Sequence, residues 1–126
     1  MPVLETMTGT RVVAAPEALD AARWSEGAVV LRLAPDDVFA IGVGEIEVAD
    51  EDAIIVAEAG FMGVWLDADE LSHQVVPHIE WPLTLTRPAL VQGLIAGVPA
   101  KLWLEDDRAL LLCAAAYARE LADRLG

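Results

Sequence analysis

Short apolar runs alternate with turns rich in proline, glycine and aspartate along most of this chain. The run VVLRL is followed by APDD and then by VFAIGV, and Pro-Asp-Asp is a favourable turn between two β-prone segments. Residues 29–42 are therefore predicted to form a β-hairpin. Further on, IEV at 46–48 and AIIVAEA at 53–59 flank an acidic turn, which predicts a second strand pair. Gly60 is expected to break the chain before another strand, FMGVWL at 61–66.

The segment DADELSHQVV carries the signals of a helix start and stop. Asp67 or Asp69 can cap the helix, and further acids in the first turn suit the helix dipole. One buried face is predicted because Leu71, Val75 and Ile79 recur every four residues. Pro77 should end or bend this helix near Val76.

The C-terminal half repeats the order of strands followed by a helix. WPLTLTRP at 81–88 holds two prolines and is expected to be extended, and ALVQGLIAG at 89–97 fits a strand or a helix, with its two glycines favouring the strand. AKLWL, EDD and RALLLC predict a second hairpin. The chain closes with an amphipathic helix whose apolar face carries Ala118, Leu121 and Leu125.

This order of elements predicts an α+β fold, with a mainly antiparallel sheet and about two helices packed on one of its faces. The length of 126 residues fits a single domain over residues 1–126. Residues 1–27 are expected to be a loosely organised lead-in, with a short helix in PEALDAARW at 16–24.

Composition excludes several classes of function. The net charge of −13 repels nucleic acid phosphate and gives no anchor for anionic lipid, so neither nucleic acid nor a membrane is an expected partner. The longest apolar run, residues 109–118, is shorter than the roughly 20 residues that span a bilayer. The N-terminus lacks the basic start and apolar stretch of a signal peptide, which predicts a cytoplasmic location.

Two segments of the chain carry a resemblance to a known family. GFMGVWLDADEL and GVPAKLWLEDDRALLLCAAAYARELADRL resemble domains of the glycine-cleavage T-protein superfamily, and the nearest member is the gamma subunit of heterotetrameric sarcosine oxidase. The resemblance covers about residues 53–125. It implies one of two roles, since the glycine-cleavage member binds tetrahydrofolate and uses an aspartate, whereas the gamma subunit is a small accessory chain without its own chemistry. No position here matches the folate-contacting aspartate motif, and the chain is shorter than a folate-binding T-protein, so the resemblance favours an accessory or binding role.

Both histidines lie in LSHQVVPHIEW, beside a glutamate. His73 and His78 would be about 140° apart on one helix, and Pro77 interrupts that helix between them. A zinc protease helix needs histidines four residues apart with glutamate after the first, where this chain has Gln74. Histidines at a helix end are the favoured interpretation. A metal site of His73, His78 and Glu80 remains the alternative.

The residues that serve as nucleophiles in enzymes lie in unfavourable contexts. Cys113 is the only cysteine and lies in the apolar run ALLLCAAA without an adjacent cation, which indicates a buried structural thiol. Neither Ser25 nor Ser72 lies in a G-x-S-x-G turn. The sequence therefore favours a protein that is not an enzyme, and no cofactor is expected.

Aromatic residues give the best candidates for binding. Trp65 and Trp103 lie in predicted strands and are expected in the core, whereas Trp81 opens the proline-rich segment and is expected to be partly exposed. We take Trp81, Trp65 and Arg87 as candidates for a ligand or interface site. The chain is predicted to be a non-catalytic binding domain that self-associates or serves as an accessory subunit. The alternative is a binder of a folate-like or other ring ligand that stacks on Trp81 or Trp65.

Overall fold

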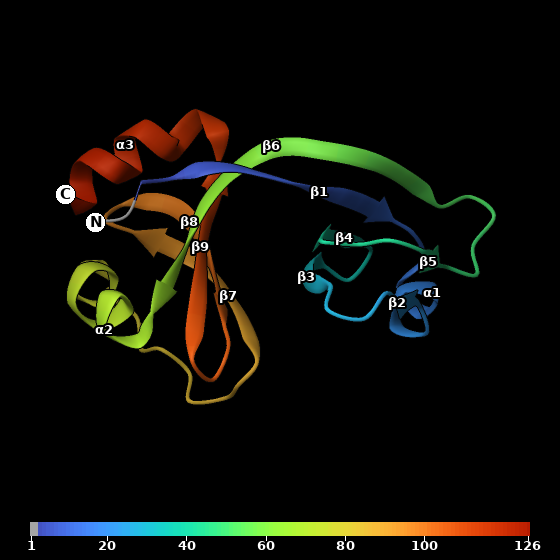
Figure 1. Ribbon diagram of the computed structural model, residues 1–126, viewed down its shortest axis with the longest axis horizontal. Helices are drawn as coiled ribbons and strands as arrows, with labels where there is room; N and C mark the ends of the chain where they lie inside the picture. The colour runs from blue at the N-terminus through green and yellow to red at the C-terminus, as the bar shows by residue number, and fades with distance from the viewer. Residues whose placement is uncertain (1–2) are drawn as a thin grey trace. The chain divides into compact units, whose positions relative to one another are not determined.

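The computed structural model describes residues 3–126 of the chain (Figure 1). The elements, in chain order, are β1 (Glu5–Val13), α1 (Pro16–Asp20), β2 (Arg23–Trp24), β3 (Val29–Ala34), β4 (Asp37–Ile41), β5 (Ile46–Glu47), β6 (Ile54–Asp67), α2 (Ala68–Glu70), the π-helix η1 (Leu71–Val75), the 3₁₀-helix η2 (Val76–His78), β7 (Ala89–Ile95), β8 (Val98–Leu104), β9 (Arg108–Ala114) and α3 (Ala115–Leu125). The paired strands run antiparallel, and the short helices confirm the predicted α+β class.

The chain divides into two compact units. Unit 1 consists of Met1–Thr6 and Gly60–Gly126, and unit 2 consists of Met7–Ala59. The long strands β1 and β6 each contribute residues to both units. The prediction of one domain over residues 1–126 remains a prediction.

Unit 2 is built on a small sheet. Strands β3, β4 and β1 pair antiparallel in that order, and the first part of β6 follows β1. The predicted hairpin at 29–42 is confirmed by the pairing of β3 with β4. One side of the sheet carries a small cluster of buried side chains, which are Val12, Ala14, Leu19, Val38 and Ala40.

Unit 1 carries a larger core between a four-stranded sheet and its helices. Its strand order is β6, β9, β8 and β7, all antiparallel, and the pairing of β8 with β9 confirms the second predicted hairpin. Alternate residues of β8 are buried, as expected for a strand with one covered face. The core cluster contains Leu4, Leu66, Val75, Ile95, Val98, Ala100, Leu102, Leu104, Ala109, Leu111, Cys113, Ala118 and Leu121.

The helical turn after β6 begins with a capping box. The Asp67 carboxylate accepts a hydrogen bond from the Glu70 amide at 2.8 Å, and the Glu70 carboxylate accepts one from the Asp67 amide at 3.0 Å. Helical turns then continue through η1 and η2 to His78, with Pro77 in the first turn of η2. The predicted face is confirmed, because Val75 is buried in the core with Leu71 and Ile79 packed against it.

Strands β7 and β8 form a tight hairpin. Ala96 and Gly97 form its two-residue turn, with φ angles of 51° and 77°. Two consecutive positive φ angles are typical of a type I′ turn, whose twist matches that of the paired strands. The ambiguous segment 89–97 is therefore strand β7 followed by this turn.

Several local predictions were wrong. Residues 46–48 do not pair with 53–59, because β5 pairs with β2. Gly60 does not break the chain but lies inside β6, since a glycine is tolerated within a strand. The predicted helix at 16–24 ends at Asp20, and Arg23–Trp24 forms β2. The lead-in 1–27 contains the nine-residue strand β1, in which threonines alternate with other side chains.

Among residues 3–126, no helix has the length and apolar character needed to cross a membrane.

Candidate functional site

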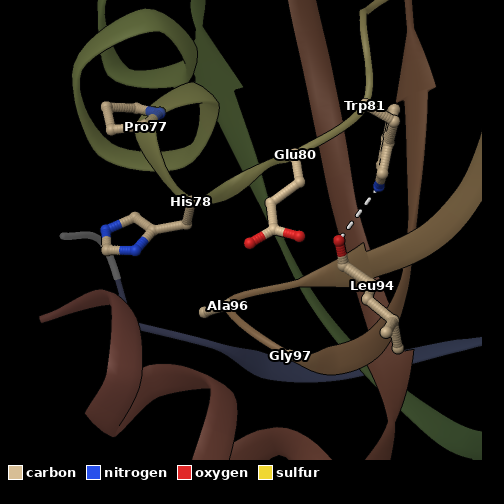
Figure 2. Close-up of a pocket in the computed structure, with 7 residues that line it drawn as sticks. All are labelled: Pro77, His78, Glu80, Trp81, Leu94, Ala96 and Gly97. Atoms are coloured by element: carbon tan, nitrogen blue, oxygen red, sulfur yellow. Dashed lines mark hydrogen bonds between the residues drawn. The ribbon is translucent and has the colours of Figure 1, made fainter.

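A pocket in unit 1 lies between the end of the helical turns and the β7–β8 hairpin (Figure 2). Its volume is about 430 Å³, within the range of small-molecule sites. Three of the candidate residues predicted from the sequence, His78, Glu80 and Trp81, lie in its wall. The full lining is Pro77, His78, Glu80, Trp81, Leu94, Ala96 and Gly97.

Trp81 is held in this wall by strand β7. Its indole N–H donates a hydrogen bond to the Leu94 carbonyl at 3.0 Å. The ring also lies directly over Gly93, where an added Cβ would come within 2.9 Å of the indole nitrogen. A glycine at this position of β7 thus makes room for the tryptophan, which is half-buried as predicted.

The two residues before Trp81 supply the polar part of the pocket. The His78 carbonyl accepts a hydrogen bond from the Ala96 amide at 2.9 Å, which fixes η2 against the hairpin turn. Figure 2 shows the Glu80 carboxylate and the His78 ring directed toward the space between η2 and that turn. A half-buried histidine and an exposed carboxylate at an apolar wall can orient a polar, flat ligand by hydrogen bonds.

His73 lies elsewhere. Its Nδ1 is 2.9 Å from the Asp69 carbonyl, on an exposed turn outside the lining of the pocket. Within residues 3–126, no group of three or more histidine, cysteine, aspartate or glutamate side chains is arranged to hold a metal ion. Of the alternative metal set, His78 and Glu80 line the pocket, whereas His73 lies in η1 and is not part of that lining.

Arg87 borders a second hollow in unit 1, which we call the Leu85 groove. Its volume is about 310 Å³, and Val76, Leu83 and Leu85 contribute to its apolar wall. Leu85 is 94% exposed, although it is a leucine. The Arg87 guanidinium donates hydrogen bonds to the Thr84 and Thr86 carbonyls at 2.6 and 2.9 Å. The lining is Ala68, Leu71, Ser72, Val76, Leu83, Thr84, Leu85, Arg87, Glu105, Asp106, Asp107 and Arg108.

Trp65 lies in neither hollow. Trp65 pairs with Leu110 in the sheet and directly precedes Leu66 along β6. Because successive side chains of a strand point to opposite faces and Leu66 lies in the core cluster, the Trp65 ring lies on the opposite face. The Arg108 guanidinium lies over this ring, 3.7 Å from its centroid. Trp65 and Trp103 are both half-buried, which differs from the predicted burial in the core.

Glu105 joins Arg108 to the second tryptophan of this face. Its carboxylate accepts hydrogen bonds from Arg108 and from the Trp103 indole, both at 2.8 Å. The Arg108 hydrogen bond is the main reason that the pKa of Glu105 lies below its ordinary value, and the Trp103 bond adds to it. One face of Trp65 is therefore already covered by a fixed cation.

Cys113 is buried in the core of unit 1, as predicted. Burial raises the pKa of its thiol, which lowers the fraction of reactive thiolate.

Sequence reasoning missed two parts of these hollows. The pocket of Trp81 is completed by the hairpin residues Leu94, Ala96 and Gly97. The Ile-Ala-Gly sequence at 95–97 indicates a hairpin turn and could have pointed to this segment. Leu85 was also missed, because a leucine between two threonines carries no sign of its exposure.

Comparison with known proteins identifies the fold. No family model matches this chain, and no curated protein matches it in sequence. A solved structure of heterotetrameric sarcosine oxidase from Corynebacterium sp. U-96, in complex with pyrrole 2-carboxylate, contains a chain that is similar with a TM-score of 0.69. The match has 13% sequence identity and covers 97% of this chain and 79% of that chain. It confirms, for the fold, the predicted resemblance to the sarcosine oxidase gamma subunit, and it extends well beyond residues 53–125.

Proposed function

We propose that this chain is a non-catalytic accessory subunit that docks on a larger protein partner. The observation that carries this proposal is the similarity of its fold, over 97% of its length, to a chain of a heterotetramer. A second copy of this chain is the alternative partner, and the cytoplasmic location remains a prediction.

The Leu85 groove is the docking surface that we propose on unit 1. Leu85 is 94% exposed and Val76 is 39% exposed, and both side chains line one hollow. An exposed apolar side chain stabilises a complex when a partner covers it, because its apolar surface is removed from water. Proline precedes and follows the segment that carries Leu85, which lowers the entropy lost when that segment docks.

The test is native mass spectrometry of the untagged chain purified from its own cells, at its native level of expression. We expect a complex with one larger protein, and we expect Leu85→Glu to release this chain from it. Tyr117→Glu is the matched control, because Tyr117 is an exposed aromatic residue on α3 that lies outside both hollows. A free monomer at native concentration would overturn the proposal. A complex of identical chains would replace the larger partner with a second copy.

The second candidate function is the binding of a ring ligand, such as a pterin, in the pocket of Trp81. It is supported by the pocket of about 430 Å³ that joins an indole wall to the Glu80 carboxylate and the His78 ring. A carboxylate can accept hydrogen bonds from the ring N–H and amino groups of such a ligand. Titration with tetrahydrofolate and with pterin should quench tryptophan fluorescence in the wild-type chain and not in Trp81→Phe. Equal quenching in both proteins would contradict this candidate.

A further inference from the structure

The first part of β6 has a free edge in unit 2. Strand β9 pairs with β6 from Phe61 to Asp67 and then turns into α3. Strand β1 follows on the other side in the strand order. Over residues 54–57, the side of β6 away from β1 therefore has no strand beside it among residues 3–126. Such an edge presents backbone N–H and C=O groups that another strand can pair with.

The side chains of this edge are apolar and exposed. Ile54, Ile55 and Val56 are 56%, 49% and 51% exposed, and Ala57 is exposed as well. Successive side chains of a strand point to opposite faces, so both faces of this segment meet solvent. Proteins usually protect an open edge with lysine, proline or a bulge. Residues 54–57 contain neither lysine nor proline, and their β-branched side chains favour strand pairing.

The charges around this edge favour one kind of partner. Residues 50–52, which lead into β6, are all acidic, and unit 2 contains eleven acidic side chains against three arginines, a net charge of −8. The Asp50 carboxylate accepts hydrogen bonds from the Ala15 and Asp52 amides at 2.8 and 2.9 Å, so it is held as an anion. Glu58, beyond the apolar residues, is paired with Arg11 at 2.7 Å. A second copy of this chain would bring like charge to the same edge, whereas a basic segment would be attracted.

We propose that residues 54–57 of β6 accept an extended segment of the partner protein as an added strand, and that this segment has a β-branched centre and lysine or arginine at the end that faces residues 50–52. Backbone pairing supplies the affinity and the flanking charges select the segment. This inference rests on the proposed accessory role, and it specifies which kind of segment of the partner binds here.

The direct test uses a synthetic probe and the full chain. The probe is the decapeptide Lys-Arg-Val-Thr-Val-Thr-Val-Thr-Lys-Arg, and its twin carries Glu-Asp in place of each Lys-Arg. At low salt we expect the basic peptide to bind at least tenfold more tightly than its twin. At saturation, amide hydrogen exchange should slow at least tenfold within residues 54–57. Equal affinity for the two peptides, or protection only elsewhere, would overturn the inference.

Variants of Val56 distinguish strand addition from non-specific electrostatic attraction of the peptide. Val56→Lys places a protecting lysine on the strand and should weaken binding of the basic peptide at least tenfold. Ala49→Lys adds the same charge at an exposed residue outside the strand, and it should weaken binding much less. Val56→Thr keeps the branched shape and should bind within about threefold of wild type. Without peptide, a concentration-dependent dimer that protects the same amides would overturn the choice of partner in favour of a second copy.

The inference and the proposed function fail in different ways. In the native complex, Val56→Lys should weaken association of this chain with its larger partner at least tenfold. A complex that survives this change unaltered would overturn β6 as the docking edge and leave the accessory role standing. If wild-type protein forms no complex in its own cells, the accessory role falls, and the peptide measurements alone decide whether the edge accepts a strand.

Discussion

The sheets of unit 1 and unit 2 are stabilised by different interactions, which are mainly apolar burial in unit 1 and a smaller cluster with ion pairs in unit 2. In unit 1, thirteen buried side chains form one cluster between the sheet and the helices, and most of them are leucine, valine or isoleucine. In unit 2 the cluster has five buried members, two of which are alanine, while Leu31 and Phe39 are buried outside this cluster. The side chain of Arg11 adds polar links there, to Asp37 at 2.6 Å and to Glu58 at 2.7 Å.

The exposed apolar residues follow the same division. Unit 1 carries isolated ones, such as Leu85 and Leu94, at the rims of hollows. Unit 2 carries three in succession along β6, beside the acidic residues 50–52. A unit with a small core and an open strand gains relatively more from a partner that covers it, which agrees with the proposed addition of a strand there.

The largest effect should come from removing a core side chain of unit 1. Leu111 is fully buried, and Leu111→Ala leaves a cavity that should cost about 3 kcal/mol of unfolding free energy. Val38→Ala, in the smaller cluster of unit 2, should cost about 1.5 kcal/mol because two methyl groups are lost rather than the larger end of a leucine. Urea unfolding followed by circular dichroism measures both. Equal losses would contradict this explanation from the volume of the deleted side chain.

A smaller difference in unfolding free energy is expected between alanine substitutions at two glycines, one in each unit. A Cβ at Gly9 of unit 2 would lie 2.5 Å from the Ala40 carbonyl oxygen, and one at Gly93 of unit 1 would lie 2.9 Å from the Trp81 ring. A backbone oxygen in a paired strand cannot move aside as a side chain can, so Gly9→Ala should cost about 2 kcal/mol and Gly93→Ala about 1 kcal/mol. Gly93→Ala alone should also shift tryptophan emission. The opposite order of stabilities would contradict the packing described around Gly9.

The polar links of unit 2 should contribute less than its core. Asp37 and Glu58 hold the pKa of Arg11 above its ordinary value, with the Asp37 hydrogen bond as the main cause. Arg11→Met leaves two part-buried carboxylates without this partner and should cost about 1 kcal/mol. Asp20→Asn is the control, since it removes only the ion pair of Arg32 with an Asp20 side chain that is 71% exposed, and it should cost almost nothing. Thermal unfolding compares the two, and equal effects would argue against a role for burial.

The smallest effect concerns the pH dependence of unit 1. Because the folded pKa of Glu105 lies below its ordinary value of 4.5, the stability from this ion pair is complete above that value and is lost as the pH falls through the folded pKa. Arg108 is 46% exposed, so Glu105→Gln should cost only about 0.5 kcal/mol at pH 7. As the pH falls below 4.5 and through the folded pKa of Glu105, the difference from wild type should shrink. A difference that grows on acidification would have the wrong sign for this cause.

Local signals were enough for much of the fold. The two hairpins, the Asp67 cap, the face of Leu71, Val75 and Ile79, and the final helix were all predicted, because each depends on turn chemistry or on the spacing of apolar residues within one segment. Strand pairing between distant segments was not, as in the partnership of β2 with β5. The length of β6 was also missed, since the neighbours on its two sides, rather than Gly60, decide where it ends.

The same division holds for the candidate site. The proximity of His78, Glu80 and Trp81 follows from the sequence, because they are nearly consecutive and come after a helix end. Their arrangement as a wall depends on the packing of distant segments, because Gly93 and the β7–β8 turn lie against Trp81 and His73 lies outside the pocket. The exposure of Leu85 and of the first part of β6 has the same origin. Hydrophobicity determines which side chains tend to be buried, but only the packing of distant segments determines which of them are covered.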